Sequence, residues 1–238
     1  MPAFLVHGVP DTAMLWDDVR KHLGRRDVIA PSMPGFGTPV PDGFDATKDA
    51  YVTWLIEQVE AVGEPVDLVG HDWGALLVQR LVSVRPDLVR TWAAGSGPLD
   101  SEYVWHDTAK TWQTPAAGEQ LMAAFTPDTM TAVLSQQGLD ATYARAVAEL
   151  IDERMKTCIL ALYRSAKKVA EDWTPLASPV PPGLVIWGND DPYASADYGR
   201  RLAERTGAMF APLEVCSHWW PHQRAADVAA LLESHWAR

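Results

Sequence analysis

The sequence predicts a doubly wound α/β domain whose mostly parallel sheet is interrupted by a helical cap. Short apolar segments alternate with segments of helical periodicity over residues 3–94. The alternation stops over residues 99–174 and resumes over residues 175–238. Because alternating strands and helices favour a parallel sheet covered on both faces, we expect a core of residues 1–98 and 175–238 and a helical cap of residues 99–174.

The first part of the predicted core contains four apolar segments that are typical of strands: Ala3–Val6, Asp27–Pro31, Val66–Val69 and Val89–Ala94. Segments with apolar residues at steps of three and four lie between them and predict helices. The first helix follows Asp11 or Thr12, either of which could cap it, and the others are Thr47–Val62 and Trp73–Val84. A glycine follows the second helix and a proline the third, and both residue types end helices.

After the cap, the alternation resumes with two strands, Leu184–Trp187 and Ala208–Val215, and two helices, Ser195–Thr206 and His222–Trp236. The cap itself contains no convincing strand and several helical segments, including Tyr143–Lys168. An insertion at this point would lie over the carboxyl ends of the strands, where open α/β sheets bind ligands. We therefore expect the cap to cover the functional site.

The composition fits a single globular domain. The 238 residues are 47% apolar and include 20 basic and 31 acidic side chains, so the net charge of −11 disfavours nucleic acid or an anionic membrane as a partner. No segment approaches the ~20 apolar residues of a membrane span, and the first residues lack the pattern of a signal peptide. Cys158 and Cys216 are far apart, and we expect them to be reduced thiols of a cytoplasmic protein.

The segment Gly70–Gly74, which reads G-H-D-W-G, lies between a predicted strand and a predicted helix. It has the form of the G-x-S-x-G turn that exposes a nucleophilic serine, with Asp72 in the serine position. Asp191 and His218 also follow apolar strands, so the three side chains could meet at the carboxyl edge of the sheet. A nucleophile, an orienting acid and a base occur here in that chain order.

Each of these residues also has a structural interpretation. An aspartate before a helix is commonly an N-cap, which is the alternative for Asp72. Asp190 and Asp191 could form a turn in N-D-D-P. His218 and His222 do not suggest a zinc site, because a proline lies between them and no acidic ligand is adjacent. We expect no metal and no cofactor, and we expect His222 at the surface of the last helix.

An aspartate nucleophile indicates displacement at a saturated carbon, because a carboxylate is already ionised at neutral pH. Attack would produce an alkyl ester of Asp72, which a water activated by His218 would then hydrolyse. Asp191 would hold the His218 tautomer and stabilise the imidazolium. The backbone N–H groups of Val9 and Trp73 are the candidates for an oxyanion hole.

Five motifs are spaced along the chain: His7–Pro10 (H-G-V-P), Pro34–Gly37 (P-G-F-G), Gly70–Gly74, Trp187–Pro192 (W-G-N-D-D-P) and His218–Trp219. Together they resemble the α/β-hydrolase superfamily, in the branch of epoxide hydrolases and haloalkane dehalogenases with an aspartate nucleophile. The resemblance covers nearly the whole chain. It implies that the acid is the aspartate three residues after the glycine, which is Asp191 rather than Asp190. It also implies an α/β-hydrolase fold with a shortened N-terminus, because the chain begins close to its first strand.

In the cap, Leu162–Arg164 resembles the segment that carries one of the two lid tyrosines of epoxide hydrolases. Tyr163 would then donate to the epoxide oxygen as the ring opens, and the alternative is that it only packs within the cap. Trp112–Pro115 corresponds to the segment of the other lid tyrosine, but it contains no tyrosine. The residues that could take its place are Tyr103, Tyr143, Trp112 and His106.

The same resemblance supplies the alternatives. Many haloalkane dehalogenases hold the halide with the indole after the nucleophile and an asparagine after His-Gly. Here Trp73 is present, but Val9 replaces the asparagine, so Trp105 or Trp112 would have to be the second donor. Fluoroacetate dehalogenases have arginines at the positions of Trp73 and Leu76, which disfavours a small haloacid as the substrate.

These observations predict a cofactor-free epoxide hydrolase that acts on a small molecule, with a haloalkane dehalogenase or a ligand-binding protein of the same fold as the alternatives. The predicted catalytic residues are Asp72, His218, Asp191 and Tyr163. The residues predicted to line the pocket are His7, Pro10, Trp105, His106, Trp112, Tyr103, Tyr143 and Trp219. The sequence leaves the identity of the substrate and the oligomeric state open.

Overall fold

A computed structural model describes all residues of the chain, 1–238. Its six strands form one parallel sheet in the order β2-β1-β3-β4-β5-β6. The strands are β1 (Ala3–Val6), β2 (Val28–Ile29), β3 (Val66–His71), β4 (Val89–Gly95), β5 (Gly183–Gly188) and β6 (Met209–Leu213). The chain runs outward from β1 to β2 and then crosses back to β3, so the strand order reverses between β1 and β3. Open α/β sheets have their ligand crevice at such a reversal.

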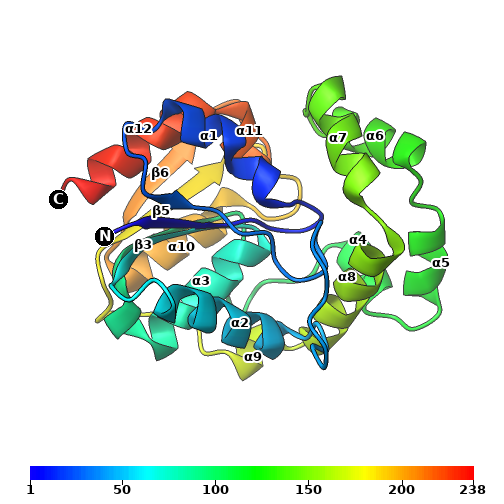
Figure 1. Ribbon diagram of the computed structural model, residues 1–238, viewed down its shortest axis with the longest axis horizontal. Helices are drawn as coiled ribbons and strands as arrows, with labels where there is room; N and C mark the ends of the chain where they lie inside the picture. The colour runs from blue at the N-terminus through cyan, green and yellow to red at the C-terminus, as the bar shows by residue number, and fades with distance from the viewer.

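Helices cover both faces of the sheet, and Figure 1 shows α1, α11 and α12 on one side and α2 and α3 on the other. The core helices are α1 (Asp17–His22), α2 (Lys48–Glu60), α3 (Trp73–Val84), α10 (Ala196–Thr206), α11 (Trp220–Gln223) and α12 (Ala225–Trp236). Short 3₁₀ helices, Ala13–Trp16 and Pro86–Leu88, precede α1 and β4. No helix combines the length and the apolar composition needed to cross a lipid bilayer.

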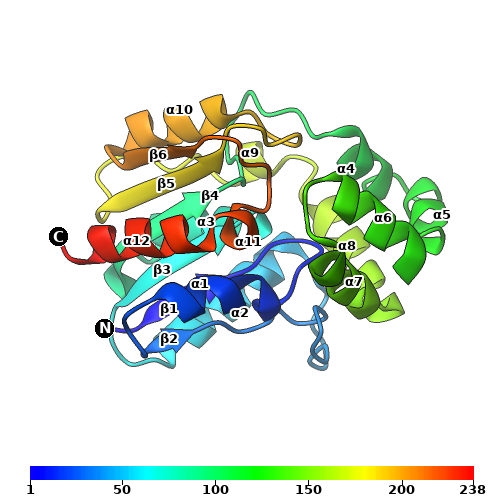
Figure 2. The same cartoon turned by 90° about the horizontal axis from the view of Figure 1, so that it is seen from above.

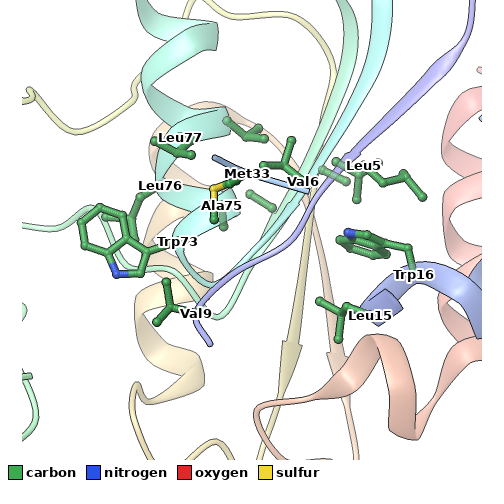
Figure 3. Packing of buried hydrophobic residues seen from close by; sticks show 14 of the residues in the cluster. Leu5, Val6, Val9, Leu15, Trp16, Met33, Trp73, Ala75, Leu76 and Leu77 are labelled. Carbon is green, nitrogen blue, oxygen red and sulfur yellow. The ribbon is translucent and has the colours of Figure 1, made fainter. Parts of the chain in front are cut away.

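The central strands are buried on both faces. Figure 3 shows Leu5 of β1 on the side of Trp16, while Val6, the next residue, lies on the side of Ala75 in α3. All four side chains are buried. Successive residues of a strand point to opposite faces, so a strand between two helical layers has to be apolar throughout. This explains why Ala3–Val6 is a continuous apolar run.

The segment between β4 and β5, which we call the cap, consists of helices. They are α4 (Asp107–Trp112), α5 (Ala117–Ala123), α6 (Pro127–Gln136), α7 (Ala141–Leu150), α8 (Glu153–Ser165) and α9 (Val169–Asp172). Figures 1 and 2 show α4 to α8 beyond the carboxyl ends of the strands, whereas both chain termini lie at the opposite end. The cap is therefore placed over the crevice of the sheet.

The cap contacts the core beside α11. The Nε2–H of His222 donates to the carboxylate of Asp140 at 2.8 Å, and the ring of Tyr143 stacks on His222 with 4.0 Å between the ring centroids. The side-chain amide of Gln223 also donates to the carbonyl oxygen of Gly138 at 3.1 Å. These contacts hold the start of α7 against the core.

Three predicted elements differ from the structure. The cap segment Tyr143–Lys168 is two helices, because the side chain of Asp152 accepts the Met155 N–H at 2.8 Å and caps the start of α8. The predicted helix His222–Trp236 is divided between α11 and α12 by Arg224, whose backbone is not helical (φ −131°). The predicted strand Asp27–Pro31 pairs with β1 only over the two residues of β2.

Asp67 is a fully buried carboxylate near the amino end of β3. Arg25 and Arg90 both donate to its Oδ2 atom, Arg25 at 2.8 Å, and the hydroxyl of Thr91 donates to Oδ1 at 2.7 Å. A buried charge is stable only when opposite charges and hydrogen bonds surround it. This cluster therefore joins β3 to β4 and to the loop that precedes β2.

We expect Asp67→Ala to lower the free energy of unfolding by about 3 kcal/mol, because it leaves two arginines without their shared partner. The value is at the low end of the range for buried pairs, since both arginines keep some contact with water. Urea denaturation followed by tryptophan fluorescence measures it. Asp87→Ala, which removes an exposed partner of Arg85, is the control. Equal losses in the two variants would contradict a stabilising role of the cluster.

Candidate active site

Asp72 lies in a sharp turn between β3 and α3. Its backbone has φ 51° and ψ −121°, a conformation that residues with side chains rarely adopt. The flanking glycines permit the turn: a Cβ on Gly70 would lie 2.3 Å from the carbonyl oxygen of Gly74, and one on Gly74 would lie 2.2 Å from that of Val6. Asp72 precedes α3, but its carboxylate makes no capping hydrogen bond. The N-cap interpretation of Asp72 is therefore wrong.

The carboxylate of Asp72 meets the loop that follows β1. The Val9 N–H donates to its Oδ1 atom at 2.7 Å. Gly8 permits this approach, since a Cβ there would lie 2.4 Å from the same oxygen. The Trp73 N–H belongs to the first residue of α3. The crevice between β1 and β3 thus brings one backbone donor to the carboxylate, and the Trp73 N–H is the next in the chain.

His218 lies between Asp72 and Asp191. Its Nδ1–H donates to Oδ2 of Asp191 at 2.9 Å, and its Nε2 atom is 3.6 Å from Oδ2 of Asp72. The other oxygen of Asp191 accepts the N–H of Tyr193 at 2.9 Å, which fixes the carboxylate in its loop. The neighbouring Asp190 is exposed. The acid beside His218 is therefore Asp191.

The two carboxylates control the protonation of His218. Burial acts to lower the pKa of His218, but Asp191 and Asp72 outweigh it and raise that pKa to about 10. Burial acts in turn to raise the pKa of Asp72, whereas His218 and the Val9 N–H hold it below its ordinary value. At neutral pH the resting site is an imidazolium between two carboxylates.

His71 is a second buried histidine of the site. Its Nε2–H donates to the backbone carbonyl of His218 at 2.9 Å, and the two rings meet edge to face with 4.8 Å between their centroids. Burial lowers the pKa of His71 to about 3, so it remains neutral beside the imidazolium. No motif marks His71 in the sequence, because it occupies the variable second position of G-x-D-x-G.

A cavity of about 260 Å³ lies over Asp72 and His218. The cap supplies most of its apolar wall, through Trp112, Leu121, Phe125, Met130 and Leu134. Besides Asp72 and His218, the polar residues that line the cavity are His106, Thr108, Gln137, Tyr163 and Tyr193. No lysine or arginine lines the cavity. A mostly apolar space with a few polar groups favours an uncharged ligand.

A narrow second cavity also reaches Asp72. Trp73, Tyr103 and Trp105 line only the narrow cavity, whereas His106, Tyr163 and Tyr193 line both. Three other residues that the sequence predicted for the pocket, Pro10, Trp112 and Trp219, line the larger cavity.

Two residues predicted to line the pocket, His7 and Tyr143, line neither cavity. His7 is fully buried: its Nδ1–H donates to the Gly8 carbonyl at 2.7 Å, and its Nε2 accepts the Met33 N–H at 2.9 Å. It shapes the loop that presents the Val9 N–H. Tyr143 is held outside the pocket by its stacking on His222.

Asp11, one of the two candidate helix caps, is instead a buried acid beside the pocket. Thr12 is the cap, since its hydroxyl accepts the Met14 N–H at 3.3 Å. Asp11 accepts the indole N–H of Trp219 at 3.1 Å, and burial raises the pKa of Asp11 to about 7. Because Trp219 lines the cavity next to His218, Asp11 fixes the position of a pocket wall.

Comparisons with known proteins agree with this architecture. A model described as the alpha/beta hydrolase family matches residues 3–231. The (E)-2-((N-methylformamido)methylene)succinate hydrolase of Acinetobacter baylyi is 25% identical over 210 residues, which are 86% of this chain and 78% of that relative.

Two solved structures share the fold. Epoxide hydrolase VrEH1 of Vigna radiata superposes with a TM-score of 0.83 at 20% identity, over 99% of this chain and 91% of the other. Haloalkane dehalogenase DbeA of Bradyrhizobium elkani USDA94 superposes with a TM-score of 0.77 at 22% identity, again over 99% and 91%. At such identities the similarity establishes the fold alone.

We expect the imidazolium of His218 to persist up to about pH 10 in the free protein, because Asp191 and Asp72 flank it. Imidazole ¹⁵N chemical shifts, followed by NMR as a function of pH, measure this midpoint. Asp72→Asn should lower it, since one of the two carboxylates is lost. Asp140→Asn, which changes a carboxylate that pairs with His222 and caps α7, is the control and should leave the His218 midpoint in place. A midpoint that does not fall in Asp72→Asn would contradict the charge arrangement.

Proposed function

This chain belongs to the alpha/beta hydrolase family, and we propose that it is an epoxide hydrolase that converts an uncharged epoxide to a diol through an ester on Asp72. The observation that carries the proposal is that Asp72 and the phenol of Tyr163 line one cavity together with His218. Burial, together with the charge of Asp72, holds the pKa of Tyr163 well above its ordinary value, so the phenol keeps its proton. An epoxide needs such a donor, because its oxygen would otherwise leave the carbon as an alkoxide.

In the first step, an oxygen of Asp72 attacks a ring carbon, and a carbon–oxygen bond of the epoxide breaks. The electron pair of the broken bond passes to the epoxide oxygen, which takes the proton of Tyr163. The products are a neutral ester on Asp72, a hydroxyl on the substrate and a phenolate on Tyr163. The resting state suits this step, since the pKa of Asp72 is held low and its carboxylate is ionised.

Esterification changes the protonation of His218. The imidazolium is stabilised by both carboxylates, and esterification removes the charge of Asp72. The pKa of His218 therefore falls just as the Tyr163 phenolate needs a proton. Transfer of this proton through water restores the phenol and leaves His218 neutral. The first step thus converts His218 into a base.

In the second step, neutral His218 removes a proton from a water that attacks the Asp72 carbonyl. The Val9 N–H, which donates to Asp72 Oδ1 in the resting state, and the Trp73 N–H are the donors to the tetrahedral oxyanion. Asp191 stabilises the imidazolium that forms again. When the ester bond breaks, its electron pair passes to the substrate oxygen, which takes the remaining proton of the attacking water. The diol leaves, and the carboxylate of Asp72 and the imidazolium of His218 remain.

The parent protein should convert styrene oxide to its diol, measured by chromatography. His218→Ala should gain the mass of one substrate molecule on the peptide that contains Asp72, because the ester forms but the base that activates water is missing. Mass spectrometry of the intact and digested protein locates the adduct. Asp72→Ala is the matched control and should gain nothing.

Two results would contradict the proposal. One is a parent protein that forms no diol from styrene oxide or from other uncharged epoxides. The other is a His218→Ala variant that turns over at the parent rate without trapping substrate, which would remove His218 from its role.

A second candidate function is haloalkane dehalogenation. The indole N–H groups of Trp73 and Trp112 are both buried without a hydrogen-bond partner. Both rings meet the ring of Tyr163 edge to face, with centroid distances of 5.4 and 4.8 Å. Two unpaired N–H donors could bind a halide ion. Bromide release from 1-bromobutane without diol formation from epoxides would favour this function.

A further inference from the structure

We propose that the hydroxyl of Tyr193 is the second hydrogen-bond donor to the epoxide oxygen and acts together with Tyr163 in ring opening. This inference rests on the proposed epoxide hydrolysis. Tyr193 belongs to the loop that follows β5 in the core, whereas Tyr163 belongs to α8 of the cap. The donor pair would therefore come from both layers of the molecule.

The position of Tyr193 supports this role. Tyr193 and Tyr163 are the two tyrosines that line both the main cavity and the narrow one, each together with Asp72. The ring of Tyr193 meets the ring of His218 edge to face, with 5.0 Å between their centroids. Its phenol thus lies on the wall where the carboxylate and the imidazole are also found.

The proton of the Tyr193 hydroxyl is free for a substrate. Gln137 lies near this hydroxyl and acts to lower the pKa of Tyr193. The side-chain oxygen of Gln137 has no hydrogen-bond partner, so it does not accept the phenol proton. Burial acts more strongly and raises the pKa of Tyr193 to about 12, so the group stays protonated at neutral pH.

The other donors near the cavity are less suitable. Tyr103 already donates its hydroxyl to the carbonyl oxygen of Tyr193 at 3.4 Å and lines only the narrow cavity. The indole N–H of Trp112 is unpaired, but an indole gives up its proton far less readily than a phenol and cannot transfer it to the epoxide oxygen. His106 accepts the Ala109 N–H at Nδ1, so its proton is on Nε2. Burial lowers the pKa of His106, and a neutral imidazole is a weaker acid than a phenol.

Asp191 connects this donor to the base. One of its oxygens accepts the Nδ1–H of His218 at 2.9 Å, and the other accepts the backbone N–H of Tyr193 at 2.9 Å. The same carboxylate therefore orients the imidazole and fixes the loop that presents the phenol. The backbone that carries the phenol and the imidazole ring are therefore both hydrogen-bonded to one carboxylate of the core.

The test compares ester formation with ester hydrolysis by rapid chemical quench and mass spectrometry, with styrene oxide as the substrate. Tyr193→Phe keeps the ring and removes only the hydroxyl. We expect it to slow ester formation at least tenfold and to leave ester hydrolysis unchanged, because the donor acts only while the ring opens. Tyr163→Phe should act in the same step, and the double variant should be slower than either. Tyr198→Phe removes a phenol outside both cavities and is the matched control.

Each other outcome overturns the inference. Ester formation at the parent rate in Tyr193→Phe shows that the hydroxyl gives no assistance. Equal slowing of both steps shows a general structural defect, which thermal unfolding of the variant would reveal independently. A parent protein that forms no ester with epoxides removes the proposed function together with this inference, whereas the first two outcomes leave the proposed function intact.

Discussion

The negative charge of the Asp72 carboxylate is the constraint on which the rest of the site depends. Only 16% of this side chain is exposed, and the cation beside it is the imidazolium of His218. That imidazolium in turn needs Asp191 on its other side. Three loops, after β3, β5 and β6, must therefore end at one edge of the sheet. A parallel sheet provides this arrangement, because all of its strands finish on the same side.

The Asp72 carboxylate also requires that backbone N–H groups come close to it. Gly8 brings the Val9 N–H to the carboxylate, and the glycines around Asp72 allow a turn that points the side chain into the crevice instead of onto the helix end. The cap then supplies an apolar roof above the charged groups. The core thus carries the charges, and the cap determines the shape of the space above them.

Much of this architecture can be predicted from the sequence. The α/β-hydrolase fold is confirmed, because apolar runs such as Ala3–Val6 and helical periodicities identify each layer. The meeting of Asp72, Asp191 and His218 could also be predicted, since each follows a strand. The positions of His7 and Tyr143 could not, because a histidine in H-G-V-P and an aromatic in the cap carry no sign of their buried partners. Tyr193 was not predicted either, although it follows Asp191 and Pro192, because no motif distinguishes it from other aromatic residues in loops.

The cap leaves the sheet after β4 and returns at β5, and these strands are direct neighbours, with Ala93 opposite Leu184. A segment whose two ends are adjacent can be lengthened, shortened or exchanged without moving any strand. New substrate preferences can therefore arise by replacement of one contiguous stretch of the gene, while the codons for Asp72, Asp191 and His218 on either side are inherited unchanged. Tyr193 is encoded outside that stretch, so any replacement cap would meet a core that already provides a phenol.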